Sequence, residues 1–196
     1  MQSNLTELGL PGIRRVPYGV HMCHFYRSRG ELVSALVPYF AAGLRANERC
    51  VWICAEPLAA DEAKRELARA GVDADAAIAR GALSIRDFGD WYARAGDLEG
   101  DAVAELWVEE EARALRDGYS GLRITGNVTF LRDAAEWQTF MEYEHAVNEV
   151  LQGRRIITLC TYSMERSSAA ALHEVVQRHN CTLDHPDEGW QIVIRS

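Results

Sequence analysis

The sequence predicts an α/β protein with a mostly parallel sheet and helices on both of its faces. Strand signals and helix signals alternate along the chain, which is typical of βαβ units whose helices pack back onto a parallel sheet. Continuous apolar runs at Cys50–Ala55 and Ile156–Tyr162 indicate strands that are buried on both faces. The 196 residues suffice for one domain with a sizeable core. We expect an irregular leader over residues 1–17 and a single domain over residues 18–196.

The first predicted strand, His21–Tyr26, leads through a short polar loop into a helix that runs to about Arg45. Ser28 is a favourable N-cap, and Glu31 completes a capping box, because each side chain can accept a hydrogen bond from a backbone N–H at the helix start. In an open α/β sheet, ligands usually bind at such a strand–loop–helix junction. The loop contains one glycine and no lysine, so it lacks the Gly-Lys-Ser/Thr sequence that holds a nucleoside triphosphate.

The elements that follow the strand Cys50–Ala55 keep the same alternation. Several predicted helices end at a glycine, which readily adopts the left-handed conformation after a helix. The expected elements are helices at Ala60–Ala70 and Asp73–Arg80, a strand at Leu83–Asp87, a helix from Asp101 to about Asp117, a strand at Leu122–Gly126, a helix at Ala134–Gln152, the strand Ile156–Tyr162, a helix from Ser168 to His179 and a last strand at Gln191–Ile194.

The composition excludes several classes of protein. The net charge of −8 argues against a nucleic-acid-binding surface, which favours basic patches. No apolar run approaches the roughly 20 residues of a membrane span, and the N-terminus lacks the pattern of a signal peptide, so we expect a cytoplasmic protein. The five cysteines include no Cys-x-x-Cys pair and are expected to be reduced, mostly buried thiols.

The first strand contains two histidines and a cysteine, which raises the question of a metal site. Side chains alternate along a strand, so His21 and Cys23 share one face while His24 points to the other. Two ligands are too few for structural zinc, which takes four, and we expect no metal and no cofactor. The sequence leaves open whether a metal is bound through His21, Cys23, Cys160 or His185.

The chain carries no recognisable catalytic motif. It contains no Gly-x-Ser-x-Gly, His-Glu-x-x-His or Gly-x-Gly-x-x-Gly sequence. The sequence therefore predicts a protein that is not an enzyme.

One stripe of the predicted helix Ala134–Gln152 is apolar except for Glu144 and Asn148. A carboxylate rarely stays buried without a partner, because unpaired burial costs several kcal/mol. Either the stripe opens onto a polar cavity, or Glu144 pairs with a basic group such as Arg123.

Several motifs, in this order along the chain, resemble the MEDS domain, the methanogen/methylotroph sensory domain named for a dichloromethane-responsive repressor. They are His21-Met22-Cys23-His24-Phe25-Tyr26, Phe40-Ala41-Ala42-Gly43-Leu44, Glu48-Arg49-Cys50-Val51, Gly121-Leu122-Arg123-Ile124-Thr125-Gly126, Tyr143-Glu144 with Asn148, Leu159-Cys160-Thr161-Tyr162 and His185-Pro186. The resemblance covers about Tyr18 to Ile194. The chain departs from the family at Thr161 and Ser163, where relatives often have Gln and Asp, and at Asn127, where they often have an acid.

The resemblance implies a three-layer RecA/KaiC-like fold without a working phosphate loop. It also implies a non-enzymatic sensor of a small, hydrocarbon-derived organic molecule in signalling or transcriptional regulation. A regulatory partner protein, a fused output module and self-association are all compatible with this role. Two alternatives stay open: a protein-interaction module of an anti-sigma-factor or kinase pathway, and a degenerate RecA-like nucleotide-binding protein.

Polar and aromatic residues gather at the predicted strand ends, and small-molecule sites usually combine such groups. Since the resemblance implies that Cys160 lies beside the first strand, we expect a crevice walled by Phe25, Tyr26, Trp52 and Trp91. The predicted ligand-binding residues are His21, Cys23, Phe25, Tyr26, Trp52, Glu56, Trp91, Tyr92, Arg123, Glu144, Cys160 and Tyr162.

Overall fold

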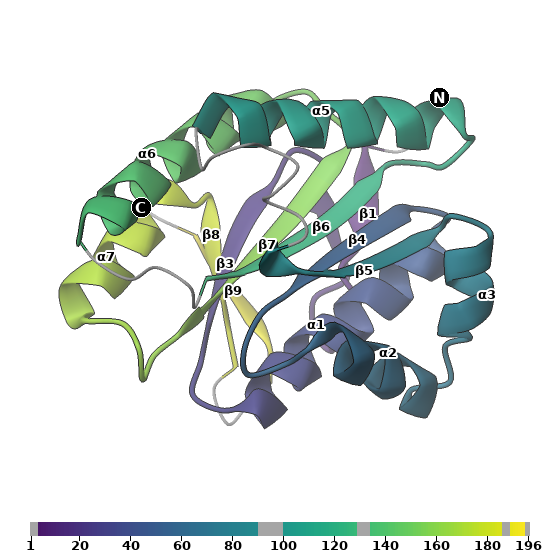
Figure 1. Ribbon diagram of the computed structural model, residues 1–196, viewed down its shortest axis with the longest axis horizontal. Helices are drawn as coiled ribbons and strands as arrows, with labels where there is room; N and C mark the ends of the chain where they lie inside the picture. The colour runs from purple at the N-terminus through teal and green to yellow at the C-terminus, as the bar shows by residue number, and fades with distance from the viewer. Residues whose placement is uncertain (1–3, 90–99, 129–133, 186–188, 195–196) are drawn as a thin grey trace.

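A computed structural model describes residues 4–89, 100–128, 134–185 and 189–194. The described residues form a seven-stranded sheet in the order β5-β4-β6-β7-β3-β8-β9, flanked by helices on both faces (Figure 1). All neighbouring strands are parallel except β8 and β9. The predicted three-layer α/β architecture with a mostly parallel sheet is confirmed. None of the described helices is both long enough and apolar enough to cross a membrane.

Most elements lie within a few residues of their predicted bounds. The strands of the large sheet are β3 (His21–Tyr26), β4 (Arg49–Cys54), β5 (Leu83–Asp87), β6 (Leu122–Val128), β7 (Ile156–Ser163), β8 (Cys181–Asp184) and β9 (Gln191–Ile194). The helices are α1 (Arg29–Arg45), α2 (Ala60–Arg69), α3 (Ala74–Ala79), α5 (Gly100–Arg116), α6 (Ala134–Leu151) and α7 (Ala169–Arg178). Strand β8 was missing from the sequence prediction, because its four residues form no long apolar run and pair mainly through their backbone with β3 and β9.

The two faces of the sheet carry separate hydrophobic cores. We call the face covered by α1, α2 and α3 the α1 face, and the face covered by α5, α6 and α7 the α6 face (Figure 1). Alternation along the strands assigns Met22, Trp52 and Leu159 to the α1 face. It assigns Ile124 and Cys160 to the α6 face. A side chain's place in the sequence therefore fixes which of the two layers it can contact.

Residues 4–17, part of the predicted irregular leader, contain regular structure. Strand β1 (Leu5–Glu7) pairs with β2 (Arg15–Pro17) as a small antiparallel sheet. Leu8 and Leu10, in the connection between them, are buried in the core of the α1 face. In sequence, the Pro-Gly turn between two three-residue strands is typical of a linker. The pairing of β1 with β2 is recognisable only from the way the segment packs against the domain.

A buried ion pair joins this N-terminal segment to the large sheet. Arg123 and Glu48 are both fully buried, and Arg123 Nε donates to Glu48 Oε2 at 2.5 Å. The guanidinium also donates to the backbone oxygens of Glu7 and Tyr39, each at 2.6 Å. The other carboxylate oxygen of Glu48 accepts a hydrogen bond from the Tyr18 hydroxyl at 2.6 Å. All charges and most donors of the pair are thereby satisfied, as burial requires.

The predicted pairing of Glu144 with Arg123 is therefore wrong. Arg123 lies on the α1 face of β6, where it contacts Glu48, whereas Glu144 belongs to α6 and packs against the opposite face. The sheet separates the two side chains.

Candidate functional site

Four buried side chains from four separate parts of the chain converge beneath α6. They are His21 of β3, Cys160 of β7, Glu144 of α6 and His179, which directly follows the last residue of α7. Their exposed fractions are 0%, 7%, 1% and 2%. Each side chain has one nitrogen, sulfur or oxygen atom that lies within 4.8 Å of the corresponding atoms of the other three. We refer to these residues as the buried cluster.

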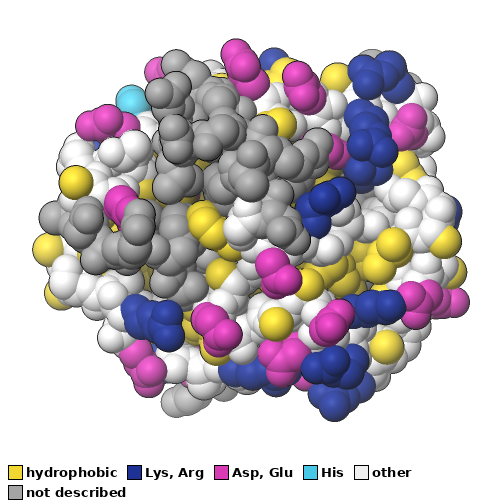
Figure 2. All heavy atoms as spheres, viewed as in Figure 1, with side chains coloured by type: hydrophobic (Ala, Val, Ile, Leu, Met, Phe, Trp, Pro, Cys, Tyr) yellow, Lys and Arg dark blue, Asp and Glu magenta, His cyan; other side chains and the backbone are white. Residues whose placement is uncertain are grey.

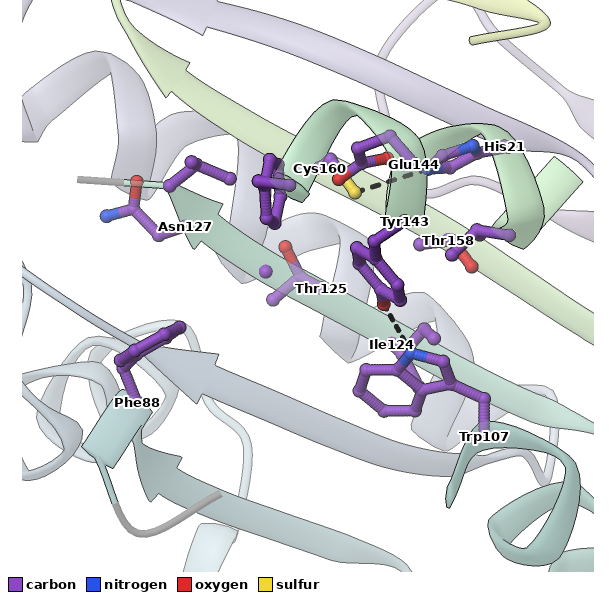
Figure 3. Close-up of a pocket in the computed structure, with 14 residues that line it drawn as sticks. His21, Phe88, Trp107, Ile124, Thr125, Asn127, Tyr143, Glu144, Thr158 and Cys160 are labelled. Carbon is purple, nitrogen blue, oxygen red and sulfur yellow. Dashed lines mark hydrogen bonds and ion pairs between the residues drawn. The ribbon is translucent and has the colours of Figure 1, made fainter. Parts of the chain in front are cut away.

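The contacts within the buried cluster centre on Glu144. Its Oε2 lies 3.1 Å from His21 Nε2 and 3.5 Å from His179 Nε2. Its Oε1 accepts a hydrogen bond of 3.1 Å from the Tyr162 hydroxyl. His21 Nε2 also lies 3.4 Å from Cys160 Sγ (Figure 3). The prediction that Glu144 faces a polar environment is confirmed, with His21 and Tyr162 as its partners in place of Arg123.

Burial and neighbouring charges set the protonation of the cluster. Burial alone would raise the pKa of Glu144, but His21, His179 and Tyr162 outweigh it and hold that pKa below its usual value. Burial, reinforced by His21, lowers the pKa of His179 to about 3, so its imidazole is neutral at ordinary pH. Burial and the nearby Glu144 carboxylate raise the pKa of Cys160 well above its usual value. The cluster thus holds a carboxylate, a thiol and at least one neutral imidazole.

A small cavity adjoins the buried cluster on the α6 face (Figure 3). Its volume is about 20 Å³, which is room for a single water-sized molecule. Gly126 of β6 lies directly beside Cys160 in the strand register, and the lack of a side chain there leaves open space. The cavity is lined by His21, Phe88, Trp107, Ile124, Thr125, Gly126, Asn127, Val128, Phe140, Tyr143, Glu144, Val147, Thr158 and Cys160.

The structure brings four of the predicted ligand-binding residues together. His21, Glu144 and Cys160 belong to the buried cluster, and Tyr162 supports it through its hydrogen bond to Glu144. Cys23 lies on the same face of the sheet, but its sulfur contacts the Thr182 hydroxyl at 3.4 Å, outside the cluster.

Two of the predicted aromatic walls do not line a crevice with His21. Tyr26 and Trp52 lie on the α1 face, where Trp52 stacks on Phe40 with ring centroids 4.6 Å apart. They are therefore on the opposite side of the sheet from Cys160.

The other predicted site residues lie apart from the cluster. Phe25 is at the end of β3, with its ring 6.1 Å from that of Tyr162, and Arg123 belongs to the ion pair with Glu48. Glu56 is exposed in the loop after β4. His185, considered above as a metal ligand, is exposed and packs against Trp190. Trp91 and Tyr92 lie outside the described residues.

The residue that the sequence analysis missed is His179. It appeared as the last residue of a predicted helix, and its role depends on β8, which carries the chain back alongside β3. The backbone N–H of Asn180 donates to the carbonyl oxygen of His21 at 2.8 Å, which holds the two histidines together. Their ring centroids are 4.0 Å apart. The only available signal was a histidine two residues before a short strand.

At the junction between β3 and α1, Ser28 caps the helix as the sequence predicts, but the Glu31 carboxylate accepts from Arg27 and not from the Ser28 N–H of a capping box. Glu31 N–H donates to Ser28 Oγ at 3.2 Å, and the Glu31 carboxylate accepts from the backbone N–H of Arg27 at 2.8 Å. The carboxylate therefore occupies the N-terminus of α1, where a phosphate group would bind in a phosphate loop. A cavity of about 80 Å³ adjoins this junction, lined in part by His24 and Trp190.

Comparison with known proteins agrees with this architecture. Residues 20–180 match the family described as the MEthanogen/methylotroph, DcmR Sensory domain, MEDS. A KaiC-like protein from Pyrococcus horikoshii OT3 is similar in structure with a TM-score of 0.61 and 14% identity, over 100% of this chain and 89% of that one. Flagellar accessory protein FlaH from Methanocaldococcus jannaschii gives a TM-score of 0.58 and 10% identity, over 93% of this chain and 80% of that one. No curated protein matches the sequence. At these identities the structural likeness shows the fold alone, which is RecA/KaiC-like.

Proposed function

The chain belongs to the MEDS family of sensory domains, and from this premise we propose that it senses a small organic molecule bound in the cavity on the α6 face. The observation that carries the proposal is the mixed lining of that cavity. Phe140 and Val147 offer apolar contact, while Glu144 and Cys160 offer hydrogen-bonding groups. Binding sites for small molecules usually combine apolar walls with a few polar groups that fix orientation.

The size of the cavity limits the ligand. About 20 Å³ is far below the roughly 300–1,000 Å³ of sites for drug-sized molecules. Since the cavity has room for only one water-sized molecule, a one- or two-carbon hydrocarbon derivative would fit only if α6 moves to widen it, with the polar atom of the ligand toward Glu144. Such a molecule belongs to the class that the family resemblance implies. No chemistry on the ligand is required, so the proposed role is non-enzymatic.

Helix α6 is the element best placed to change position when a ligand binds in the cavity. It contributes Phe140, Glu144 and Val147 to the cavity and packs against both α5 and α7. A ligand shifts a conformational equilibrium only by its differential affinity for the two states. A molecule that fits the cavity better in one position of α6 would stabilise that position and alter the surface offered to a partner.

A thermal-shift screen tests the proposal with short alcohols, aldehydes, amines and halomethanes. A ligand at 100 times its dissociation constant should add about 2.7 kcal/mol of stability, or about 5–11 °C in melting temperature for a chain of this length. The variant Gly126→Ala should remain folded, because the new methyl group would meet no atom within 4 Å, and it should lose the shift by filling the cavity.

Gly30→Ala is the matched control for this screen. Its new methyl group would meet only the Ser28 hydroxyl, at 3.7 Å, and Gly30 is not among the residues that line the cavity. It should keep the full shift. Hits that stabilise Gly126→Ala and Gly30→Ala equally would place the ligand elsewhere and contradict the proposal.

The RecA/KaiC-like fold favours nucleotide binding at the β3–α1 junction as a second candidate. Two features of the junction oppose it. The loop has no lysine to reach the outer phosphates, and the Glu31 carboxylate competes for the N-terminus of α1. On the face drawn in Figure 2, acidic and basic side chains of the described residues are mixed, so the visible described residues form no extended basic patch that would attract phosphate groups.

We expect no ATP hydrolysis and no stabilisation by magnesium and ATP. A phosphate assay and a thermal-shift measurement with millimolar nucleotide check both. Magnesium-dependent turnover that disappears in Arg27→Ala would instead establish the second candidate, since Arg27 is the exposed cation of the loop.

A further inference from the structure

The donor atoms of the buried cluster are those of a metal site. Nε2 of His21, Nε2 of His179, Sγ of Cys160 and Oε2 of Glu144 lie within 4.8 Å of one another. Imidazole nitrogen, thiolate sulfur and carboxylate oxygen are the ligands that zinc takes in proteins, usually four at a time. We propose that these four residues bind one divalent transition-metal ion, with zinc as the best match.

Three of the six distances between the donor atoms are close to those around a tetrahedral ion. Zinc lies about 2.0–2.2 Å from nitrogen and oxygen and about 2.3 Å from sulfur, so neighbouring donors around it lie about 3.3–3.6 Å apart. The contacts of His21 Nε2 are 3.1 Å to Glu144 Oε2 and 3.4 Å to Cys160 Sγ. The contact between His179 Nε2 and Glu144 Oε2 is 3.5 Å. The other pairs lie within 4.8 Å of each other, so the donor atoms would move closer together on binding an ion.

A hydrogen bond from Nδ1 of His179 to the backbone leaves Nε2, the unprotonated nitrogen of the ring, facing the cluster. Its Nδ1 lies 2.8 Å from the carbonyl oxygen of Val175, which can only accept, so Nδ1 must carry the proton. In a neutral imidazole this leaves Nε2 as a lone pair directed at Glu144. A backbone carbonyl behind a histidine is a common outer partner in metal sites, because it fixes the tautomer that binds the ion.

His21 is held in the same way by Asn148. The Asn148 amide nitrogen donates to the carbonyl oxygen of Arg178, which turns the amide oxygen toward His21 Nδ1 at 3.2 Å. His21 Nδ1 therefore donates, and its Nε2 faces Glu144 and Cys160. Asn148, the second polar residue on the apolar stripe of α6, thus has a role in orienting a donor.

Without an ion, two acceptors of the cluster face each other with no proton between them. His179 Nδ1 carries the proton of that imidazole, so His179 Nε2 is a lone pair, and it lies 3.5 Å from Glu144 Oε2, which also accepts. Among the described residues, no hydrogen bond of suitable geometry reaches Glu144 Oε2 or His179 Nε2. Unpaired buried polar atoms of this kind are uncommon and call for an explanation, such as an ion.

A divalent ion also balances the charge. The Glu144 carboxylate and a Cys160 thiolate carry two negative charges, which a divalent cation neutralises, and the thiol proton passes to solvent on binding. The filled site is then neutral, which lowers the cost of burying it. With four protein ligands the site is closed and structural, and it does not depend on the organic ligand proposed above.

Metal analysis of the purified chain tests the inference. We expect about one zinc ion per chain, or stoichiometric uptake of zinc by chelator-treated protein in competition with a chromophoric chelator. Cobalt in the same site should give a thiolate-to-metal charge-transfer band that is lost in Cys160→Ser. Zinc affinity should fall more than about 100-fold in Cys160→Ser and about 10- to 100-fold in Asn148→Leu, which removes only an outer partner.

Cys23→Ser is the matched control, because Cys23 is a buried thiol on the same face that contacts Thr182 instead of the cluster. Cys23→Ser and the cavity-filling Gly126→Ala should both keep the ion, which separates this test from that of the organic ligand. Wild-type protein that takes up neither zinc nor cobalt would overturn the inference, as would a cobalt thiolate band that survives Cys160→Ser. The wild-type titration decides the matter even if a variant fails to fold.

Discussion

Replacing Arg123 with methionine should lower the free energy of unfolding by about 3–5 kcal/mol, because it leaves the Glu48 carboxylate buried and unpaired. For a chain of this length the melting temperature should fall by about 6–20 °C. The backbone oxygens of Glu7 and Tyr39 would also lose their donor. Thermal and urea denaturation measure both quantities.

Arg69→Met provides the control for the buried pair. Arg69 contacts Glu66 at 2.8 Å but is 70% exposed, and such surface pairs contribute about 0–1 kcal/mol. The double variant Glu48→Gln/Arg123→Met should recover part of the lost stability, because no charge then remains buried. Equal stability of Arg123→Met and Arg69→Met would show that the pair is solvated.

Replacing Gly9 with alanine should cost about 2–5 kcal/mol, the second-largest effect we expect. Gly9 has a φ of +91°, and a methyl group there would lie 2.2 Å from the carbonyl oxygen of Pro38 and 2.7 Å from the Ala42 methyl. The left-handed backbone costs an alanine about 1–2 kcal/mol, and overpacking adds about 1–3 kcal/mol. Denaturation curves again provide the measurement.

Gly118→Ala isolates the packing contribution. Gly118 has a φ of +86°, but an added methyl group would meet nothing within 4 Å. It should therefore cost only the backbone strain. If the two variants lost the same stability, Gly9 would not pack against α1, and the N-terminal segment would not be part of the domain.

These two predictions concern a segment whose structure the sequence did not reveal. Strands β1 and β2 have three residues each, which is too short for a periodic pattern, and their buried contacts come from α1 and β6. The partners of Arg123 were hidden for the same reason. Glu48 and Glu7 lie 75 and 116 residues away along the chain, and nothing in the local pattern connects such positions.

Glu144 shows how far a local pattern can reach. Its place on an apolar stripe of α6 predicted a buried carboxylate with a polar environment, and it is buried with His21, His179 and Tyr162 around it. The pattern could not name those partners. The sequence analysis named Arg123 as a basic residue that could pair with Glu144, but the sheet lies between these two residues.

Trp52 and Tyr26 were predicted to lie near Cys160 because the register between the strands was not known. Each was correctly assigned to a buried strand. Parallel pairing of β6 with β7 and of β7 with β3 brings Gly126, Cys160 and Cys23 side by side, and alternation then sends Tyr26 and Trp52 to the other face.

The sequence by itself determined the α/β class, the order of most elements, the capped junction without a phosphate-binding lysine and the buried carboxylate of α6. Each of these depends on residues close together in the chain, where periodicity and capping act. Only the tertiary structure decided that His21, Glu144, Cys160 and His179 meet and that Arg123 joins Glu48. Those contacts depend on strand order, register and the layer to which each helix belongs, and these are set by packing between segments far apart in sequence.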